Sequence, residues 1–446
     1  MKYVYSIYVK PKRHPSLEEF YAGSGILLTG ATGFVGKGLL EKLIRMCPRI
    51  AAIFILIRPK TNETIEQRLK KILDDPVPKH PSAFNRFYAI KSDMGLPDLG
   101  LTQGDRNLLL EKVNIVFHSA ATVRFNEPLD VAVNVNTKGT ARIIELWNEL
   151  KHPISFVHVS TAYIIRKRSM VIDMCDKFDK TSINQIENSI LETYPNTYTF
   201  SKNLAEQIVA SKCKDQPVAI VRPSVIAAAL KEPCPGWIQN ISAVTGTYVL
   251  IGKGCVTAVR GNRDTRLDII PIDFVVDVIM CIAWHVTLHP EHEVKVYNCT
   301  SNAKPFSIEA PLNDTIWYPI CSVIANKYLY NFLSITPRIL PAFAIDIILR
   351  LRENNLSGII SVKMLRDSDM FKLDLKDMDW ENYGVIYLMG VRKFILKQEF
   401  KSTYLRIKRT NINTYIFGYF RLYWLHQITK ISGIIIFLWI ILSFVY

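Results

Sequence analysis

A tyrosine and a lysine four residues apart are the residues in this sequence best suited to proton transfer. Tyr198 and Lys202 lie in the stretch YTFSK, and on a helix they share one face, one turn apart. An ammonium beside a phenol favours the phenolate, so we expect Lys202 to lower the pKa of Tyr198. Such a phenol can protonate a carbonyl oxygen while a hydride adds to the carbon. Alone the pair is a weak motif, because many helices carry it by chance.

Two hydroxyl side chains precede this pair and are suited to the same carbonyl oxygen. Ser160 and Thr161 end a β-branched run over 154–161 that predicts a strand. Ligands of open α/β sheets bind at the carboxyl ends of the strands. Either hydroxyl can donate a hydrogen bond to the developing oxyanion, and the residues alone do not choose between them.

A glycine-rich stretch near the N-terminus predicts a dinucleotide-binding turn. In TGATGFVGKGLLEKL, Gly30, Gly33 and Gly36 follow a predicted strand over 25–30 and open a predicted helix over 35–47. Bare N–H groups and the dipole at a helix N-terminus bind anions, and missing side chains let a pyrophosphate approach. A tight turn without a ligand is the alternative, but the first βαβ unit is the context that favours a dinucleotide.

The end of the second predicted strand indicates which dinucleotide binds. NAD-binding chains usually have an acidic residue there for the ribose 2′-hydroxyl. Here the strand over 50–59 ends in LIRPK, with Arg58 and Lys60. Cations suit a 2′-phosphate, so we predict NADPH as the cofactor, with solvated surface charge as the alternative.

Strands and helices alternate through the first half of the chain. Strands are predicted over 25–30, 50–59, 87–93, 113–121, 154–161 and 217–224, and helices over 35–47, 63–73 and 129–150. This alternation predicts an α/β fold, a Rossmann-type doubly wound parallel sheet with helices on both faces. From about residue 300 to 400 the sequence is apolar, aromatic and interrupted by prolines, which indicates a smaller, mostly helical C-terminal domain.

The last sixteen residues, 431–446, carry no charge. As a helix they would be roughly 24 Å long at about 1.5 Å per residue, slightly short of a ~30 Å hydrocarbon core. After Glu399 every charged side chain is Lys or Arg, with aromatic residues between them. Cations and aromatics before an apolar run predict a cytosolic flank and a C-terminal membrane segment, with a terminal core helix as the alternative.

Composition excludes several other classes. The 446 residues carry a net charge of +15, yet no block of Lys and Arg interleaved with aromatics stands out before residue 400, so we expect no nucleic-acid partner. The eight cysteines form no CxxC pair and no zinc-ligand spacing, which predicts free thiols, a reducing compartment and no metal. The N-terminus lacks the features of a secretory signal.

The chain resembles the fatty acyl-CoA reductases, a group within the extended short-chain dehydrogenases/reductases. The similarity runs from about residue 18 to 405, through GILLTGATGFVGKGLLEKL, HSAATVRFNEPL, FVHVSTAY, PNTYTFSKNLAE, IVRPSVI, DIIPIDFVVD, IWYP, ILPA and DMDWENY. It implies an NADPH-binding Rossmann-type reductase domain over 18–300, a helical C-terminal domain over 301–405, and a basic aromatic flank with a hydrophobic membrane tail over 406–446. In the family a glycine usually stands where this chain has Ser92.

The resemblance also implies an activity and a location. The family reduces a long-chain fatty acyl-CoA to a primary fatty alcohol with two NADPH, through an aldehyde. By position, Tyr198 is the proton donor, Lys202 its activator, and Thr161 or Ser160 the oxyanion partner. The implied enzyme is anchored in the peroxisomal or endoplasmic reticulum membrane by its tail, with the catalytic domain facing the cytosol.

The cofactor-binding residues carried over by position follow the strand ends. They are Gly30, Thr32, Gly33, Phe34, Val35 and Gly36 in the turn, Arg58 at the 2′-phosphate, Asp93 at the adenine, Ala120, Ala121 and Asn136 along the ribose and nicotinamide, and Pro223, Tyr198 and Lys202 beside the nicotinamide.

Two other functions share part of this pattern. One is a different NADP-dependent reductase of the same fold, acting on a steroid or a sugar nucleotide. The other is a membrane scaffold that binds NADPH without catalysis. The Tyr–Lys pair argues against the scaffold, because only chemistry needs it.

Overall fold

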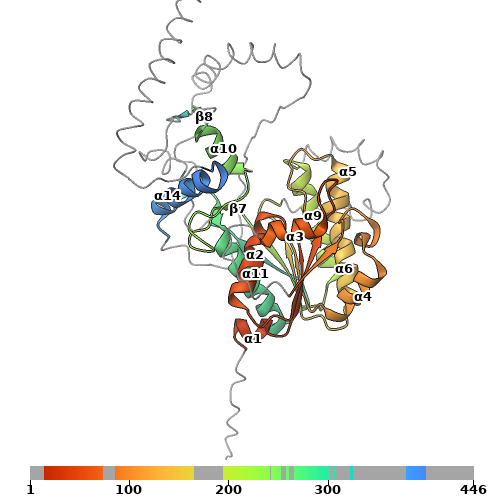
Figure 1. Cartoon of the computed structure of the whole chain (residues 1–446). Helices are drawn as coiled ribbons and strands as arrows, with labels where there is room; N and C mark the ends of the chain where they lie inside the picture. The colour runs from red at the N-terminus through yellow and green to blue at the C-terminus, as the bar shows by residue number, and fades with distance from the viewer. Residues whose placement is uncertain are drawn as a thin grey trace, which may run out of the picture.

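A seven-stranded sheet lies at the centre of the fold (Figure 1). The computed structural model describes residues 15–73, 86–164, 194–241, 243–252, 258–260, 266–301, 306–307, 322–324 and 378–397. The strand order is β11-β6-β5-β4-β1-β2-β3, and every pairing is parallel. The strands are β1 (Gly25–Thr29), β2 (Ala52–Ile57), β3 (Phe87–Lys91), β4 (Ile115–His118), β5 (Ser155–Val159), β6 (Val218–Pro223) and β11 (Lys295–Cys299).

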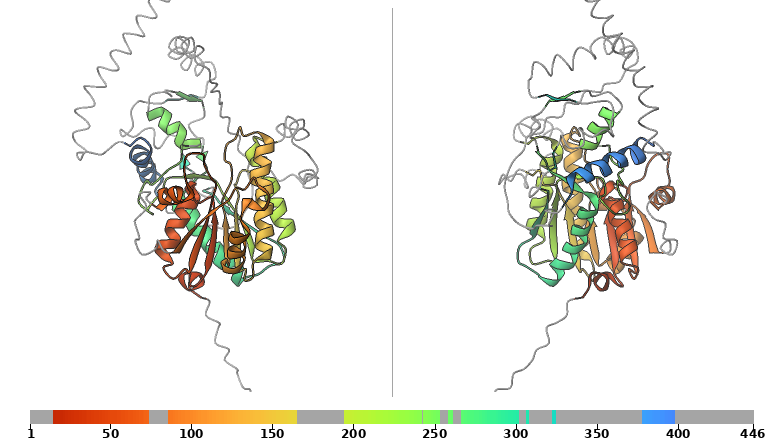
Figure 2. Two further views of the ribbon diagram at one scale, coloured as in Figure 1. Left: turned by 45° about the vertical axis from the view of Figure 1, so that its right-hand side comes forward. Right: turned by 90° about the vertical axis from the view of Figure 1, so that its left-hand side faces the viewer.

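Helices cover both faces of this sheet, as Figures 1 and 2 show. One face carries α1 (Leu17–Tyr21), α2 (Phe34–Met46), α3 (Ile65–Leu73) and α11 (Ile272–Leu288). The other carries α4 (Gln103–Lys112), α5 (Leu129–Ala132), α6 (Gly139–Glu149) and α9 (Thr197–Lys212). The predicted doubly wound α/β fold is therefore confirmed.

Apolar side chains on both faces explain why the central strands are continuous hydrophobic runs. In β1, Ile26 and Leu28 pack into the core beneath α2 and α11, and Leu27 packs into the core on the opposite face. A strand buried on both sides has no polar face, so its sequence does not alternate. The six predicted strands are confirmed as β1 to β6, each somewhat shorter than expected. The seventh, β11, was not predicted.

The predicted helix over 129–150 is interrupted. A π-helical segment, η3 (Val133–Lys138), separates α5 from α6. The Thr140 hydroxyl donates to the Asn136 carbonyl at 2.6 Å within this region. Such insertions are frequent at functional sites. Here the segment turns Asn136 toward α9, which it contacts through Ser201.

Within the predicted C-terminal domain, the structure describes one long element, α14 (Trp380–Gly390), which continues as η5 (Val391–Ile395). This element, blue in Figure 2, lies on the side of the sheet that carries α2 and α11. Tyr383 is fully buried, and its hydroxyl donates to the Ala228 carbonyl at 2.8 Å. Tyr387 bonds Thr245 of α10 (Ala243–Gly252) at 2.7 Å. The helix α14 therefore shares its core with the Rossmann-type domain.

The predicted membrane tail, 406–446, lies outside the described residues. Among the helices that the structure does describe, none combines the length and the hydropathy that a bilayer span needs.

Two glycines bring α14 against the loop over 228–237, and this contact generates a stability prediction. A Cβ on Gly390 would overlap the Gly236 carbonyl, and Gly236 has φ +78°. We expect Gly390→Ala to lower the free energy of unfolding by about 1–3 kcal/mol, the usual cost of overpacking. Thermal unfolding of the full chain measures this.

Gly104→Ala is the matched control for that substitution. Gly104 lies in α4, and its added Cβ would meet only Thr102 Oγ1, at 3.9 Å. Alanine has a higher helix propensity than glycine, so this variant should unfold at the wild-type temperature or slightly above it. Equal melting temperatures for the two variants would contradict the proposed close contact.

Candidate active site

The glycine turn after β1 passes directly over the end of β4. Gly30 has φ +74°, and a Cβ there would lie 2.8 Å from the Ala120 nitrogen and from Ser119. The Gly33 N–H donates to the Gly30 carbonyl at 2.9 Å, and a Cβ on Gly36 would overlap that same carbonyl. Only glycine combines this backbone conformation with such close approach at Gly30.

The N-terminus of α2 is open to a ligand. Its N-cap is Gly33, which supplies no side-chain hydrogen bond, and Thr32 and Gly33 are exposed. Phe34 is buried and Val35 half-buried, so the turn presents backbone to solvent and side chains to the core. Uncapped N–H groups at a helix N-terminus suit a pyrophosphate. The residues present therefore fit a dinucleotide.

Cations gather at the end of β2. Arg58 and Lys60 are exposed, and the Arg68 guanidinium of α3 donates to the Arg58 carbonyl. No acidic residue stands at this strand end, although Glu63 forms ion pairs with Arg68 and with Lys71. Arg68 was not predicted. Its signal was a basic residue in the first turns of the helix after β2.

The next strand end holds Asp93. Its carboxylate accepts a hydrogen bond from the Gly95 N–H at 2.9 Å, and its own N–H donates to Leu99. Ser92 is buried, and its hydroxyl donates to the Leu99 carbonyl at 3.0 Å. The Ser92 side chain thus helps to close this turn.

Ala120 and Ala121 follow β4 and are half-buried beside the glycine turn. Asn136 is buried, and its amide is already occupied within the protein. It accepts from the Thr122 N–H at 2.8 Å and donates to the Thr122 carbonyl at 3.1 Å and the Ser201 hydroxyl at 3.0 Å. These hydrogen bonds join the segment after β4 to α9. The predicted contact of Asn136 with the cofactor stays a prediction.

The Tyr–Lys pair lies on α9, as predicted, and the lysine reaches the end of β5. Lys202 is 2% exposed, and its ammonium donates to the Val159 carbonyl at 2.7 Å. Ser160 and Thr161 follow directly and are buried. Pro223, the last residue of the neighbouring strand β6, is buried as well. The structure thus brings Lys202 and the two predicted hydroxyls to the carboxyl end of β5, and Tyr198 lies one turn before the lysine on α9.

The two candidate hydroxyls differ in their partners. Thr161 Oγ1 accepts a hydrogen bond from the Tyr163 N–H at 3.3 Å. The Ser160 hydroxyl is buried and has no hydrogen-bond partner among the described residues. A buried hydroxyl without a partner is costly unless a ligand supplies one.

The expected pKa shift of Tyr198 is wrong in direction. Burial raises the pKa of Tyr198 to about 12, because the phenolate would lose its hydration. Burial also lowers the pKa of Lys202 to about 8, although Glu206 opposes this effect. The lysine donates to a backbone carbonyl, and it therefore does not offset the desolvation of the phenol. Tyr198 is accordingly a neutral phenol at neutral pH and retains the proton that it would donate.

A buried histidine of β4 joins the end of β1 to the first turn of α6, and sequence reasoning missed it. His118 bonds Thr29 at 2.8 Å through Nδ1 and Thr140 at 3.0 Å through Nε2. The Thr140 hydroxyl already donates to Asn136, so we assign the imidazole proton to Nε2, with Nδ1 as acceptor. Burial first, and Lys202 second, lower the pKa of His118 to about 3. The imidazole therefore stays neutral.

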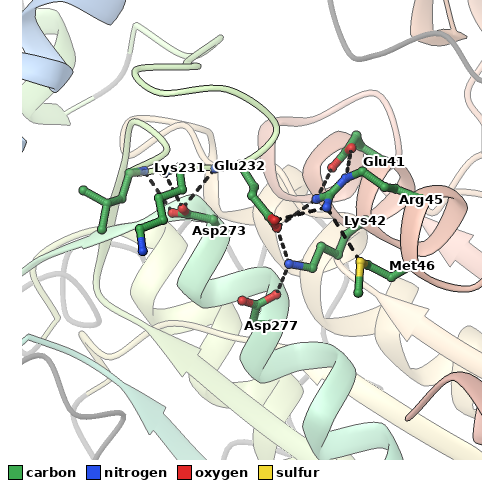
Figure 3. Close-up of polar contacts among 9 residues, drawn as sticks. Glu41, Lys42, Arg45, Met46, Lys231, Glu232, Asp273 and Asp277 are labelled. Carbon is green, nitrogen blue, oxygen red and sulfur yellow. Dashed lines mark hydrogen bonds and ion pairs between the residues drawn. The ribbon is translucent and has the colours of Figure 1, made fainter.

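A network of charged side chains braces α2 on its outer side (Figure 3). Glu232 pairs with both Lys42 and Arg45 of α2, and Lys42 also reaches Asp277 of α11 at 2.8 Å. The arginine and lysine partners lower the pKa of Glu232 to about 2. These contacts hold the helix that begins at the glycine turn against α11 and the loop over 228–237.

Trp237 of the same loop packs beneath the glycine turn. Its ring lies 5.1 Å from the ring of Phe34, the first residue of α2, and a Cβ on Gly38 would meet it at 3.5 Å. Trp237 is fully buried. The position of the turn therefore depends on a loop that is also in contact with α14.

Comparison with known proteins finds relatives over most of this chain. The family model described as "Male sterility protein", an NAD-binding family, matches residues 28–279. A mouse protein named "Fatty acyl-CoA reductase 1" is 32% identical over 86% of this chain and 87% of its own length. "Fatty acyl-CoA reductase wat" of Drosophila melanogaster is 30% identical over 89% of each.

Solved structures share the fold at lower identity. The terminal R domain of the myxalamid PKS-NRPS pathway superimposes with a TM-score of 0.60 and 22% identity, over 84% of this chain and 92% of that one. A reductase domain of a nonribosomal peptide synthetase from Mycobacterium tuberculosis gives 0.57 and 18%, over 85% and 93%. At this identity the likeness supports the fold alone.

The open glycine turn generates a binding prediction. A Cβ on Gly33 would meet only the Gly30 oxygen, at 3.2 Å, which is a tight contact, so Gly33→Ala should fold with a modest loss of stability. The added methyl would occupy the space that a pyrophosphate needs, and we expect the dissociation constant for NADPH to rise about tenfold. Cofactor fluorescence measures the binding, and thermal unfolding provides the control. Unchanged affinity would contradict the assigned cradle.

Proposed function

This chain belongs to the fatty acyl-CoA reductase family and is a nicotinamide-dependent oxidoreductase, and from that premise we propose that it reduces long-chain acyl-CoA to a primary alcohol. The observation that carries the proposal is the packing of α9, which holds the Tyr–Lys pair, against the end of β5, where the Lys202 ammonium donates to the Val159 carbonyl directly before Ser160 and Thr161. That edge of the sheet also carries the glycine turn.

Tyr198 acts as the proton donor in this proposal. Its high pKa keeps the phenol protonated, and the phenol can donate a hydrogen bond to the thioester carbonyl oxygen. Bound NADPH supplies the hydride. The Ser160 hydroxyl, which lacks a partner among the described residues, supports the same oxygen as negative charge develops on it. Lys202, in its charged form, donates to the Val159 carbonyl and so holds α9 against the end of β5 that carries the two hydroxyls.

The reaction then balances in two rounds. Addition of hydride and a proton to the thioester gives a thiohemiacetal, whose collapse releases the CoA thiol and leaves an aldehyde. A second hydride and a second proton reduce the aldehyde to the alcohol. Tyr198 serves both rounds, because in each it faces a carbonyl oxygen that gains negative charge. No side chain of this chain has to form a covalent bond to the acyl group.

Two features favour an acyl-CoA over a sugar nucleotide or a steroid. The segment after β4 exposes Val123 and Phe125, with 58% and 52% of their surface accessible, and the Phe125 ring lies 6.0 Å from the ring of Tyr198. An apolar rim beside the proton donor suits an alkyl chain. The net charge of +15 suits the phosphates of CoA.

We infer NADPH rather than NADH from the end of β2. Arg58 and Lys60 are exposed at the point where an NAD-binding chain would carry a carboxylate. The Arg68 guanidinium, bonded to the Arg58 carbonyl, adds a third cation. This set favours a 2′-phosphate by charge.

We also propose that the tail over 431–446 anchors the chain in the peroxisomal or endoplasmic reticulum membrane, with the catalytic domain on the cytosolic side. Support comes from its uncharged run and from the basic, aromatic stretch before it. A tethered enzyme would meet its amphiphilic substrate at the membrane surface.

Tyr198→Phe tests the catalytic assignment. With palmitoyl-CoA and NADPH, the wild type should release CoA thiol and form hexadecanol. The variant should lose about a thousandfold in rate while binding NADPH normally, because only the donated proton is removed. Tyr88→Phe, at an exposed tyrosine on β3, is the matched control and should keep full activity. Turnover of a sterol instead of palmitoyl-CoA would favour the other reductase, and no turnover of any substrate would favour the scaffold.

Deletion of residues 431–446 tests the anchor. The truncated chain should move from the membrane pellet to the soluble fraction, while the full chain remains in the pellet after a high-salt wash. Full-length chain in the soluble fraction, or truncated chain in the washed pellet, would overturn this assignment.

A further inference from the structure

A buried ion pair that the proposed mechanism does not use lies beneath Lys202. Glu206 of α9 and Arg222 of β6 form a bidentate contact, with Arg222 Nε 2.8 Å from Glu206 Oε1 and the second guanidinium nitrogen bonded to Oε2. The Glu206 side chain is 6% exposed and that of Arg222 is 14% exposed. A pair at this depth loses much of its hydration, and such pairs often add little net stability. A contribution to stability therefore does not by itself explain why this pair is present.

The pair lies next to the lysine in two independent ways. Glu206 is four residues after Lys202 on α9, and therefore one turn along the same helix face. Arg222 follows Val221 of β6, and Val221 pairs with Val159, whose carbonyl accepts the lysine ammonium. The helix α9 and the strand β6 thus place the Glu206 carboxylate and the Arg222 guanidinium near the Lys202 ammonium.

The other groups around the ammonium provide no negative charge. His118 of β4 and His158 of β5 both have a lowered pKa, caused by burial first and then by Lys202, so both rings stay neutral. Tyr198 on α9 stays protonated. Among the described groups that act on the pKa of Lys202, Glu206 is the one that raises it.

We propose that Glu206, held in place by Arg222, is a positioning residue that keeps Lys202 charged and directed at the carbonyl end of β5. The bidentate contact fixes the carboxylate, so it cannot rotate away to water. Arg222 is itself positive, and the effect on the lysine is that of an oriented pair with its negative end toward the ammonium. This inference rests on the proposed function only in giving Lys202 its part in hydride transfer.

The double variant Glu206→Gln/Arg222→Gln tests the inference without leaving a buried charge unpaired. The measurement is the pH dependence of kcat with palmitoyl-CoA and NADPH. Activity that needs a charged lysine is lost as the pH rises through the lysine pKa. Removing the carboxylate lowers that pKa, so the alkaline loss of activity should move to lower pH by about one unit. Glu206→Asp keeps the negative charge but moves it farther from the lysine. In this variant the alkaline loss of activity should therefore move by less than in the double variant.

Glu41→Gln is the matched control. Like Glu206, Glu41 is a buried carboxylate on a helix and is bound by an arginine. The arginine here is Arg45 of the same helix, with its Nε 2.6 Å from Glu41 Oε1. Both variants should lower the melting temperature, but Glu41→Gln should leave the pH profile in place. If the double variant also leaves it in place, the pair is structural only and the inference fails.

A second readout separates this inference from the proposed function. The dissociation constant for NADPH, measured by fluorescence against pH, needs no acyl substrate, because Lys202 is expected beside the nicotinamide. A wild type that binds NADPH but does not reduce palmitoyl-CoA would refute the proposed function alone. The inference then depends on whether the double variant shifts the alkaline loss of NADPH binding.

Discussion

A lysine ammonium buried between a helix and a sheet loses its water, and neighbouring groups must replace it. For Lys202 the replacements are the Val159 carbonyl, at 2.7 Å, and the carboxylate of Glu206 one turn away. His118 and His158 can lie close by because burial keeps them neutral. The hydroxyls at the end of β5 and the phenol of Tyr198 are positioned relative to this charge, so the arrangement of α9 against β5 and β6 determines the site.

The cofactor side of the site depends on a different constraint, which is close backbone contact. Gly30 and Gly36 allow the turn after β1 to approach the end of β4 and to close on itself. The brace of charges on α2 and the ring of Trp237 against Phe34 then hold this turn from behind (Figure 3). One set of contacts positions the nucleotide and the other positions the proton donor, and the sheet edge joins them.

Local patterns in the sequence predicted the strands β1 to β6, the glycine turn and the Tyr–Lys pair. Each has a short-range signal: apolar runs closed by Gly or Pro, glycine at fixed spacing, and a four-residue helical repeat. The pKa shift of Tyr198 was predicted in the wrong direction, because the four-residue spacing reveals the lysine but not the burial of the phenol. The network of His118 with Thr29 and Thr140 joins residues as far as 89 positions apart, so no local pattern could reveal it. The strand β11, KVYNC, contains Lys295 and Asn298 and has no apolar run to stand out.

The contact between Gly236 and Gly390 has a practical consequence for anyone producing this protein. The sequence becomes apolar, aromatic and proline-rich near residue 300, which suggests a domain boundary at which an expressed fragment could be made to end. Such a fragment would lose Tyr383 and Tyr387, which are buried against Ala228 and Thr245. The remaining Rossmann-type domain would then expose the apolar surface that α14 covers. Exposed apolar surface of that kind promotes aggregation. The compositional boundary of the chain and its minimal soluble unit are therefore different things.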